Sequence, residues 1–210
     1  MPLVPRYIRD LQSYKPGQNI AEIQRKLGLK KIIKLASNEN PYGPSPLALV
    51  AVQSSLQDNF RYPDAAAVLL RQKLADRFDL KLSNVTVGSG SEGVMSAIMR
   101  TFLRQDDEII GAENSFIGFR VLANASGIRT NWIPLKNYRH DLEAMATYIN
   151  DYTKLIYLAN PDNPSGTYFT VEEFDRFMED IPERVLVMLD EAYFEYAEHL
   201  DDYPDSMHYR

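Results

Sequence analysis

The 210-residue chain contains no cysteine, and this absence excludes disulfides, thiol catalysis and cysteine-ligated metals. Histidine is also scarce, with three residues in the whole chain and no HExxH pair. Zinc sites in proteins are built mainly from cysteine and histidine, so we expect no metal site.

Long apolar runs are missing as well. No stretch approaches the roughly 18 residues of a membrane-spanning helix, and nothing at the N-terminus resembles a signal peptide. The formal net charge of −6 argues against a nucleic-acid partner. With 45% hydrophobic and 25% charged residues, the composition is that of an ordinary globular protein. We therefore expect a soluble cytoplasmic protein with one large domain or two small ones.

Short apolar segments alternate with segments of helical periodicity through most of the chain. We expect strands at 31–35, 85–87, 108–111, 129–134, 154–159 and 184–189. We expect helices at 20–29, 46–58, 64–78, 116–126, 141–150 and 170–179, and another directly after residues 88–91. In this last helix Val94, Ile98 and Phe102 lie on one stripe, with Met95 and Met99 beside it. This alternation predicts an α/β domain with a mostly parallel sheet and helices on both faces.

A glycine-rich segment at 88–93 (GSGSEG) follows one predicted strand and opens a helix. Backbone N–H groups at such a helix start can hold a phosphate. The glycine spacing fits neither a P-loop nor the dinucleotide-binding fingerprint, and a plain tight turn is the alternative.

The segment 160–166 (NPDNPSG) follows another predicted strand. Its two prolines restrict the backbone and predict a rigid turn. Asn163 stands between them, and its amide can donate a hydrogen bond to an anionic oxygen. The alternative is an elaborate β-turn without a binding role.

Asp190 follows the apolar strand predicted at 184–189. A carboxylate in such a place is costly unless a cation pairs with it. The cation is either a protonated ring nitrogen or the Mg²⁺ of a nucleotide hydrolase, but the second needs a Walker A motif, which the chain lacks.

Phe116 follows the strand predicted at 108–111, where its ring either stacks on a planar ligand or belongs to the core.

Taken in order, these segments resemble the pyridoxal-phosphate-dependent aminotransferases of fold type I, and within them the histidinol-phosphate aminotransferase branch. The matching segments are 14–17 (YKPG) with the helix after it, 35–44 (LASNENPYGP), 61–64 (RYPD), 88–93, 115–116, 160–166 and 190–193 (DEAY). The YKPG, NENPYG and RYPD segments favour this branch over the aspartate and aromatic aminotransferases.

The resemblance implies that pyridoxal 5'-phosphate is the cofactor. Backbone N–H groups of Gly90 and Ser91 would hold its phosphate, and Phe116 would stack on its ring. Asn163 and Tyr193 would hydrogen-bond its phenolic oxygen.

The resemblance also implies that Asp190 pairs with the pyridinium nitrogen and keeps it protonated. Tyr62 and Tyr14 would reach across a homodimer interface to the cofactor phosphate and the substrate phosphate respectively. Asn38 is a further substrate-contact candidate.

The family's Schiff-base lysine has no counterpart here, because none of the nine lysines follows Asp190. We therefore expect this lysine beyond Arg210 and expect the chain alone to be inactive. On this interpretation residues 1–44 form an N-terminal arm with a first substrate loop. Residues 45–210 form part of the cofactor-binding large domain, and the C-terminal small domain is absent.

The implied activity of the full-length parent is transfer of an amino group from histidinol phosphate to 2-oxoglutarate, a step of histidine biosynthesis. One alternative is another fold type I enzyme, such as an aromatic aminotransferase or a threonine-phosphate decarboxylase. The other is a truncated remnant that binds a partner or cofactor without turnover.

Overall fold

The computed structural model describes residues 3–11 and 19–209. The chain divides into two compact units, one made of Met1–Tyr14 with Arg71–Arg210 and the other of Lys15–Leu70. The boundary expected after residue 44 falls inside the second unit.

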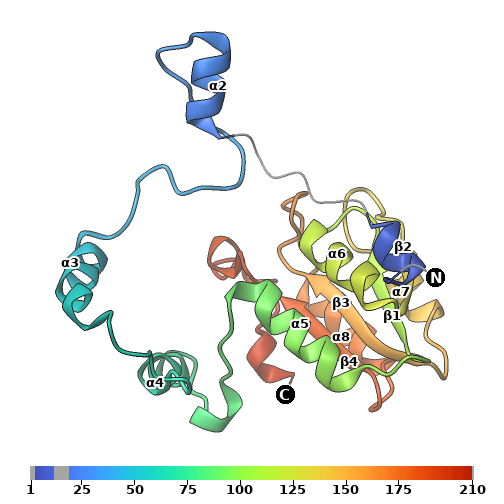
Figure 1. Cartoon of the computed structure of the whole chain (residues 1–210). Helices are drawn as coiled ribbons and strands as arrows, with labels where there is room; N and C mark the ends of the chain where they lie inside the picture. Colours follow the sequence, from blue (N-terminus) through green and yellow to red (C-terminus); the bar gives the residue numbers. More distant parts are fainter. Residues whose placement is uncertain (1–2, 12–18, 210) are drawn as a thin grey trace. The chain divides into compact units, whose positions relative to one another are not determined.

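The larger unit is built on a four-stranded sheet with strand order β2-β1-β3-β4 (Figure 1). All three pairs of neighbouring strands are parallel. The strands are β1 Glu108–Ala112, β2 Arg129–Ile133, β3 Thr153–Ala159 and β4 Leu186–Asp190. The predicted α/β fold with a parallel sheet is confirmed.

Helices cover both faces of this sheet. Two of them contribute to one buried cluster and two to another. The first pair is α5 Gly90–Phe102 with α6 Ile117–Ser126, and the second is α7 Leu142–Thr147 with α8 Val171–Glu179. α8 begins with the capping box of Thr170 and Glu173.

Strand β3 shows why both faces are apolar. Leu155 and Tyr157 pack in the cluster of α5 and α6, while Ile156 and Leu158 pack in the cluster of α7 and α8. Successive side chains of a strand point to opposite faces, so a strand covered on both sides needs a continuous apolar run. These four side chains are fully buried.

The structure describes four further α-helices, of which the second and the third belong to the unit Lys15–Leu70. They are α1 Arg6–Arg9, α2 Ile20–Leu27, α3 Pro46–Ser55 and α4 Val68–Arg77, with 3₁₀ turns at Leu56–Asp58, Leu82–Asn84, Phe194–Tyr196 and Ser206–His208. α2 ends at Gly28, whose φ of +65° is the left-handed conformation that closes a helix.

Two predicted strands are absent. Residues 31–35 and 85–87 form no strand, because no described segment pairs with either of them. Next to the segment 85–87, the Arg71 side chain donates hydrogen bonds to the carbonyl oxygens of Val85 (2.7 Å) and Leu82 (2.8 Å). The guanidinium of Arg71 therefore binds the Val85 carbonyl oxygen. In a sheet, that oxygen would accept a hydrogen bond from a neighbouring strand.

The buried residues of α5 match the expected apolar side of this helix in part. Met95 and Met99 are the α5 side chains in the core, whereas Phe102 is 48% exposed. Ile98 of the expected stripe packs against the same buried cluster, and the buried positions are the two methionines expected beside that stripe.

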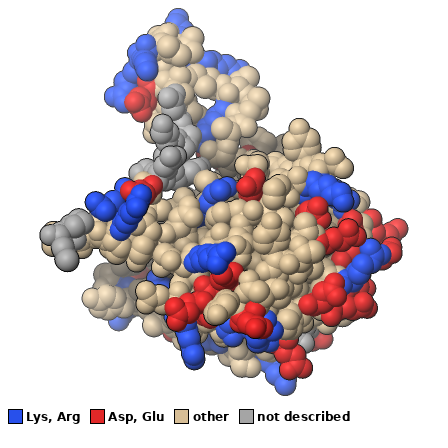
Figure 2. Space-filling model, turned by 90° about the vertical axis from the view of Figure 1, so that its right-hand side faces the viewer, with Lys and Arg blue, Asp and Glu red and all other residues tan. Residues whose placement is uncertain are grey.

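Acidic and basic side chains are interspersed on the surface shown in Figure 2. In the part of the chain that the structure describes, no helix is long and apolar enough to cross a membrane.

Candidate active site

The direction of strand order reverses between β1 and β3. The chain runs from β1 to β2 on one side of β1, then returns to place β3 on its other side. α6 follows β1 and packs on one face, while α8 follows β3 and packs on the other. In open α/β sheets, ligands bind at this reversal of strand order. The segments that leave β1 and β3 here carry the predicted residues Phe116 and Asn163.

Asp190 ends the neighbouring strand β4. Its Oδ2 accepts a hydrogen bond from the Tyr157 hydroxyl (2.8 Å), and its Oδ1 accepts one from the Ala192 N–H (3.2 Å). Its carbonyl oxygen accepts from the Asn160 N–H (2.9 Å), which joins the ends of β3 and β4. Among the described residues, no Lys, Arg or His forms an ion pair with this half-buried carboxylate. Each oxygen has a second lone pair, so the group can still accept from a cationic N–H.

The N-terminus of α5 lies close to that of α6. Phe116 occupies the N-cap position of α6. A Cβ at Gly118 would lie 2.5 Å from Cζ of Phe116 and 2.5 Å from Oε1 of Glu92, a residue in the first turn of α5. The absent side chain at Gly118 therefore leaves the space that the Phe116 ring occupies.

Gly90 and Ser91 are the first residues of α5 and are exposed. Gly90 adopts a φ of +69°, and its N–H donates to the carbonyl oxygen of Gly88 (2.9 Å). One of the two predicted phosphate donors is thus engaged within the turn itself. The phosphate site stays a prediction.

The other predicted residues lie in several parts of the molecule. Asn163 and Tyr193 are half-buried in the segments after β3 and β4. Asn38 and the fully exposed Tyr62 belong to the unit Lys15–Leu70. Tyr14 lies outside the described residues.

Residues 30–206 match the family described as aminotransferase class I and II. The chain belongs to this family. It is 45% identical over 203 residues to histidinol-phosphate aminotransferase 2 of Hydrogenovibrio crunogenus, and 41% identical over 204 residues to histidinol-phosphate aminotransferase of Moorella thermoacetica. These matches cover 97% and 96% of this chain but 54% and 52% of the relatives, so the chain spans about half their length.

A solved structure agrees with the sequence comparison. The histidinol-phosphate aminotransferase of Sinorhizobium meliloti, crystallised with pyridoxal-5'-phosphate, is 28% identical and superposes with a TM-score of 0.81. It covers 93% of this chain, and the chain covers 52% of it. The predicted resemblance to this branch of the aminotransferases is confirmed.

Tyr157 is a residue of the candidate site that sequence reasoning missed. Its ring is fully buried and stacks on Phe119, with the ring centroids 3.8 Å apart and the planes 8° from parallel. Burial, and then the neighbouring Asp190 carboxylate, raise the pKa of the Tyr157 hydroxyl far above its usual value. The hydroxyl therefore stays protonated and remains a donor to Asp190.

Asp162, a buried polar residue of the candidate site, was also missed. It is buried in the turn after β3, where it accepts hydrogen bonds from Ser115, His140 and Ser165. A signal was available, since an aspartate inside a rigid turn at the end of a buried strand needs buried donors.

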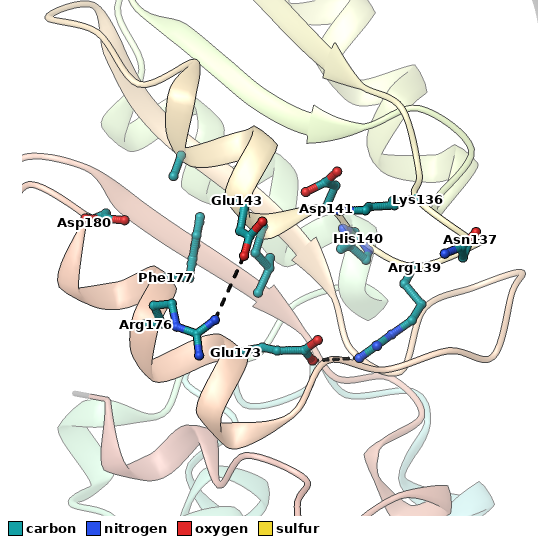
Figure 3. Close-up of a pocket in the computed structure, with 12 residues that line it drawn as sticks. Lys136, Asn137, Arg139, His140, Asp141, Glu143, Glu173, Arg176, Phe177 and Asp180 are labelled. Carbon is teal, nitrogen blue, oxygen red and sulfur yellow. Dashed lines mark hydrogen bonds and ion pairs between the residues drawn. The ribbon is translucent and has the colours of Figure 1, made fainter.

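A cavity of about 270 Å³ lies beside this centre, between α7 and α8 (Figure 3). Four of its charged side chains form two ion pairs, Arg139 with Glu173 (2.7 Å) and Arg176 with Glu143 (4.0 Å). None of the predicted site residues lines it. His140 lines it and also contacts Asp162, so the cavity adjoins the candidate site.

Proposed function

We propose that this chain supplies the cofactor-binding half of a pyridoxal-phosphate-dependent aminotransferase. The observation that carries the proposal is Asp190, a half-buried carboxylate at a strand end with two hydrogen-bond donors and, among the described residues, no cationic partner. A protonated ring nitrogen would complete its surroundings.

The side chains around Asp190 fit the remaining groups of that cofactor. The flat Phe116 ring suits stacking on an aromatic ring, and Asn163 and Tyr193 offer donors to a phenolic oxygen. The N-terminus of α5, at Gly90 and Ser91, suits a phosphate. When bound, the charged pyridinium supplies an electron sink for the carbanion that forms as the substrate loses its α-proton.

Asp190 and Tyr157 would act together on that ring. The Asp190 carboxylate would hold a proton on the ring nitrogen, since an adjacent negative charge favours the protonated form. The Tyr157 hydroxyl would keep the carboxylate oriented and charged. We assign the Schiff-base role to no residue here, since none of the nine lysines follows Asp190.

For the complete protein we propose transfer of an amino group from histidinol phosphate to 2-oxoglutarate. The names of the relatives, 45% and 41% identical, support the amino donor. Tyr14 and Asn38 are the proposed substrate contacts.

We also propose that the complete protein is a homodimer in which Tyr62 reaches the cofactor phosphate of the neighbouring subunit. The exposed apolar residues of the unit Lys15–Leu70 support this, with Leu47 81% and Phe60 76% exposed. The helix α3 is apolar on nearly all sides, and such helices are normally covered.

Cofactor binding to the 210-residue chain tests the proposed role of Asp190. We expect pyridoxal 5'-phosphate to bind the wild-type chain, and Asp190→Asn to weaken binding roughly ten- to hundredfold. That range corresponds to the loss of about 1.5–3 kcal/mol from a charge-assisted bond. Titration followed by absorbance and by quenching of tyrosine fluorescence measures both affinities.

Asp151→Asn is the matched control, because Asp151 is exposed and lies at the opposite, amino-terminal end of β3. It should bind the cofactor as the wild type does. Failure of the wild type to bind, or equal affinities of wild type and Asp190→Asn, would contradict the proposed function.

A further inference from the structure

Asp162 connects the two segments that carry the proposed ring contacts. Along the chain it directly precedes Asn163. In space its Oδ1 accepts a hydrogen bond from the hydroxyl of Ser115, the residue directly before Phe116. One carboxylate therefore links the segments that follow β1 and β3.

Both carboxylate oxygens of Asp162 have two contacts. Besides Ser115, Oδ1 contacts Nε2 of His140 (3.3 Å), while Oδ2 accepts from the hydroxyl (2.7 Å) and the N–H (3.3 Å) of Ser165. The backbone is held as well, since its N–H donates to Thr167 O (2.8 Å) and its carbonyl accepts from Gly166 N–H (2.8 Å). Asp162 thus has little freedom to move.

The carboxylate is charged, which strengthens these bonds. Burial acts to raise the pKa of Asp162, but the hydrogen bonds from His140, Ser115 and Ser165 outweigh burial and lower the pKa below its usual value. Hydrogen bonds to an ionised acceptor are roughly twice as strong as neutral ones.

The Ser115–Asp162 bond joins the two segments where the sheet no longer does. The backbone register between β1 and β3 ends at the pair Ile110 and Ile156. Beyond that pair the chain continues from β1 to α6 on one face of the sheet, and from β3 to α8 on the other face. The bond reconnects the two segments next to Phe116 and Asn163.

We propose that Asp162 is a positioning residue that sets the distance between Phe116 and Asn163, and with it the slot for a flat aromatic ring. This inference rests on the proposed function. It assigns Asp162 no contact with the reacting atoms, because its effect passes through Ser115 on one side and through its own backbone on the other. Binding contacts need to be held within about 0.5 Å, so the link governs ring affinity.

The test compares two serines of the α6 region. Ser115→Ala removes the link and leaves the bonds of Asp162 to His140 and Ser165 in place. Ser126→Ala is the matched control, because the Ser126 hydroxyl donates to Ala123 O (2.6 Å) at the other end of α6. Two quantities are measured for each variant, namely amide hydrogen exchange at residues 116–118 and 163–166, and affinity for pyridoxal 5'-phosphate.

In Ser115→Ala we expect exchange to rise about tenfold or more in both segments together and the dissociation constant of pyridoxal 5'-phosphate to rise about tenfold. Ser126→Ala should change neither quantity, even if its melting temperature falls as much as that of Ser115→Ala. Unchanged exchange, an increase in one segment alone, or unchanged cofactor affinity in Ser115→Ala would overturn the inference.

Substitution of Asp162 itself separates hydrogen bonding from bulk. Asp162→Asn keeps an oxygen that accepts from Ser115, but its NH₂ group replaces the oxygen that accepts from Ser165. It should therefore retain more of the cofactor affinity than Asp162→Ala. Equal losses in both variants would contradict positioning by hydrogen bonds. If the wild-type chain does not bind the cofactor, the proposed function fails, while hydrogen exchange still decides whether the link exists.

Discussion

Asp190 and Glu191 are adjacent carboxylates with different surroundings. Asp190 receives donors from Tyr157 and a backbone amide, whereas Glu191 accepts from Tyr203 (3.1 Å) and Ser206. The Tyr203 hydroxyl also donates to Asn160 O (2.5 Å), and it has one proton to share between two acceptors. Glu191 is therefore poorly compensated as an anion.

Glu191→Gln should stabilise the chain at neutral pH. Burial, the largest effect, raises the pKa of Glu191, so its contribution to stability is fully present below the unfolded pKa and is lost as the pH rises through the folded value. A glutamine carries no charge and can donate to the Tyr203 oxygen. The melting temperature should rise, by about 2–4 °C for each 1 kcal/mol gained.

Thermal unfolding at pH 7 and at about pH 4 checks this pH dependence. The increase in melting temperature should be present at pH 7 and shrink toward pH 4. Glu179 is exposed, so Glu179→Gln serves as the control. A Glu191→Gln chain that is less stable at pH 7 would show that the charge of Glu191 is used by the fold.

Single residues also show how far the sequence could predict the site. The placement of Asp190 and Asn163 was predictable because Asp190 ends one apolar strand, the turn that carries Asn163 follows another, and strand ends meet at one edge of a parallel sheet. Tyr157 was not, because a tyrosine inside an apolar strand is normally a core residue. Its partner Asp190 lies 33 positions away and is brought near only by strand pairing.

At the scale of elements, the site depends on how α5 and α6 begin. Their first turns approach each other where Gly118 leaves room for the Phe116 ring and the Glu92 carboxylate. The order of these helices along the chain was predicted. Their closeness depends on the absence of a side chain at Gly118, and the pattern of apolar residues in the sequence does not indicate this closeness.

Gly118→Ala should weaken cofactor binding more than it changes stability. The new Cβ would lie 2.5 Å from the Phe116 ring and force it out of place, although alanine is the better helix former. We expect the dissociation constant of pyridoxal 5'-phosphate to rise about tenfold.

A double-mutant cycle with Phe116→Ala isolates the cause of that loss. In the Phe116→Ala background, Gly118→Ala should weaken binding no further, because the displaced ring is already gone. Additive losses in the double variant would mean that Gly118 acts independently of Phe116.

At the scale of the whole molecule, the two expected strands that did not form are informative. Residues 31–35 and 85–87 have strand-like composition but no pairing partner among the described residues. Strand formation requires a neighbour, which composition alone cannot supply. The four strands that did form alternate with helices along the chain and pair with one another.

The proposed sharing of sites between subunits predicts complementation. Tyr62→Ala chains and Asp190→Ala chains should each bind pyridoxal 5'-phosphate weakly. If Tyr62 acts in the neighbouring subunit, a mixed dimer has one doubly defective site and one intact site. After exchange, about a quarter of all sites should then bind at wild-type affinity.

Native mass spectrometry establishes whether mixed dimers have formed, and titration with the cofactor counts the intact sites. Mixed dimers that bind no better than the separate variants would place Tyr62 within its own subunit or outside the site.

The central claim is that Asp190 holds a proton on the cofactor ring nitrogen. The ¹⁵N chemical shift of pyridoxal 5'-phosphate labelled at that nitrogen, bound to this chain, measures the protonation directly. We predict the shift of a protonated ring in the wild-type chain and of a neutral ring in Asp190→Asn at the same pH. A neutral ring in the wild type, or the same shift in both proteins, would contradict the claim.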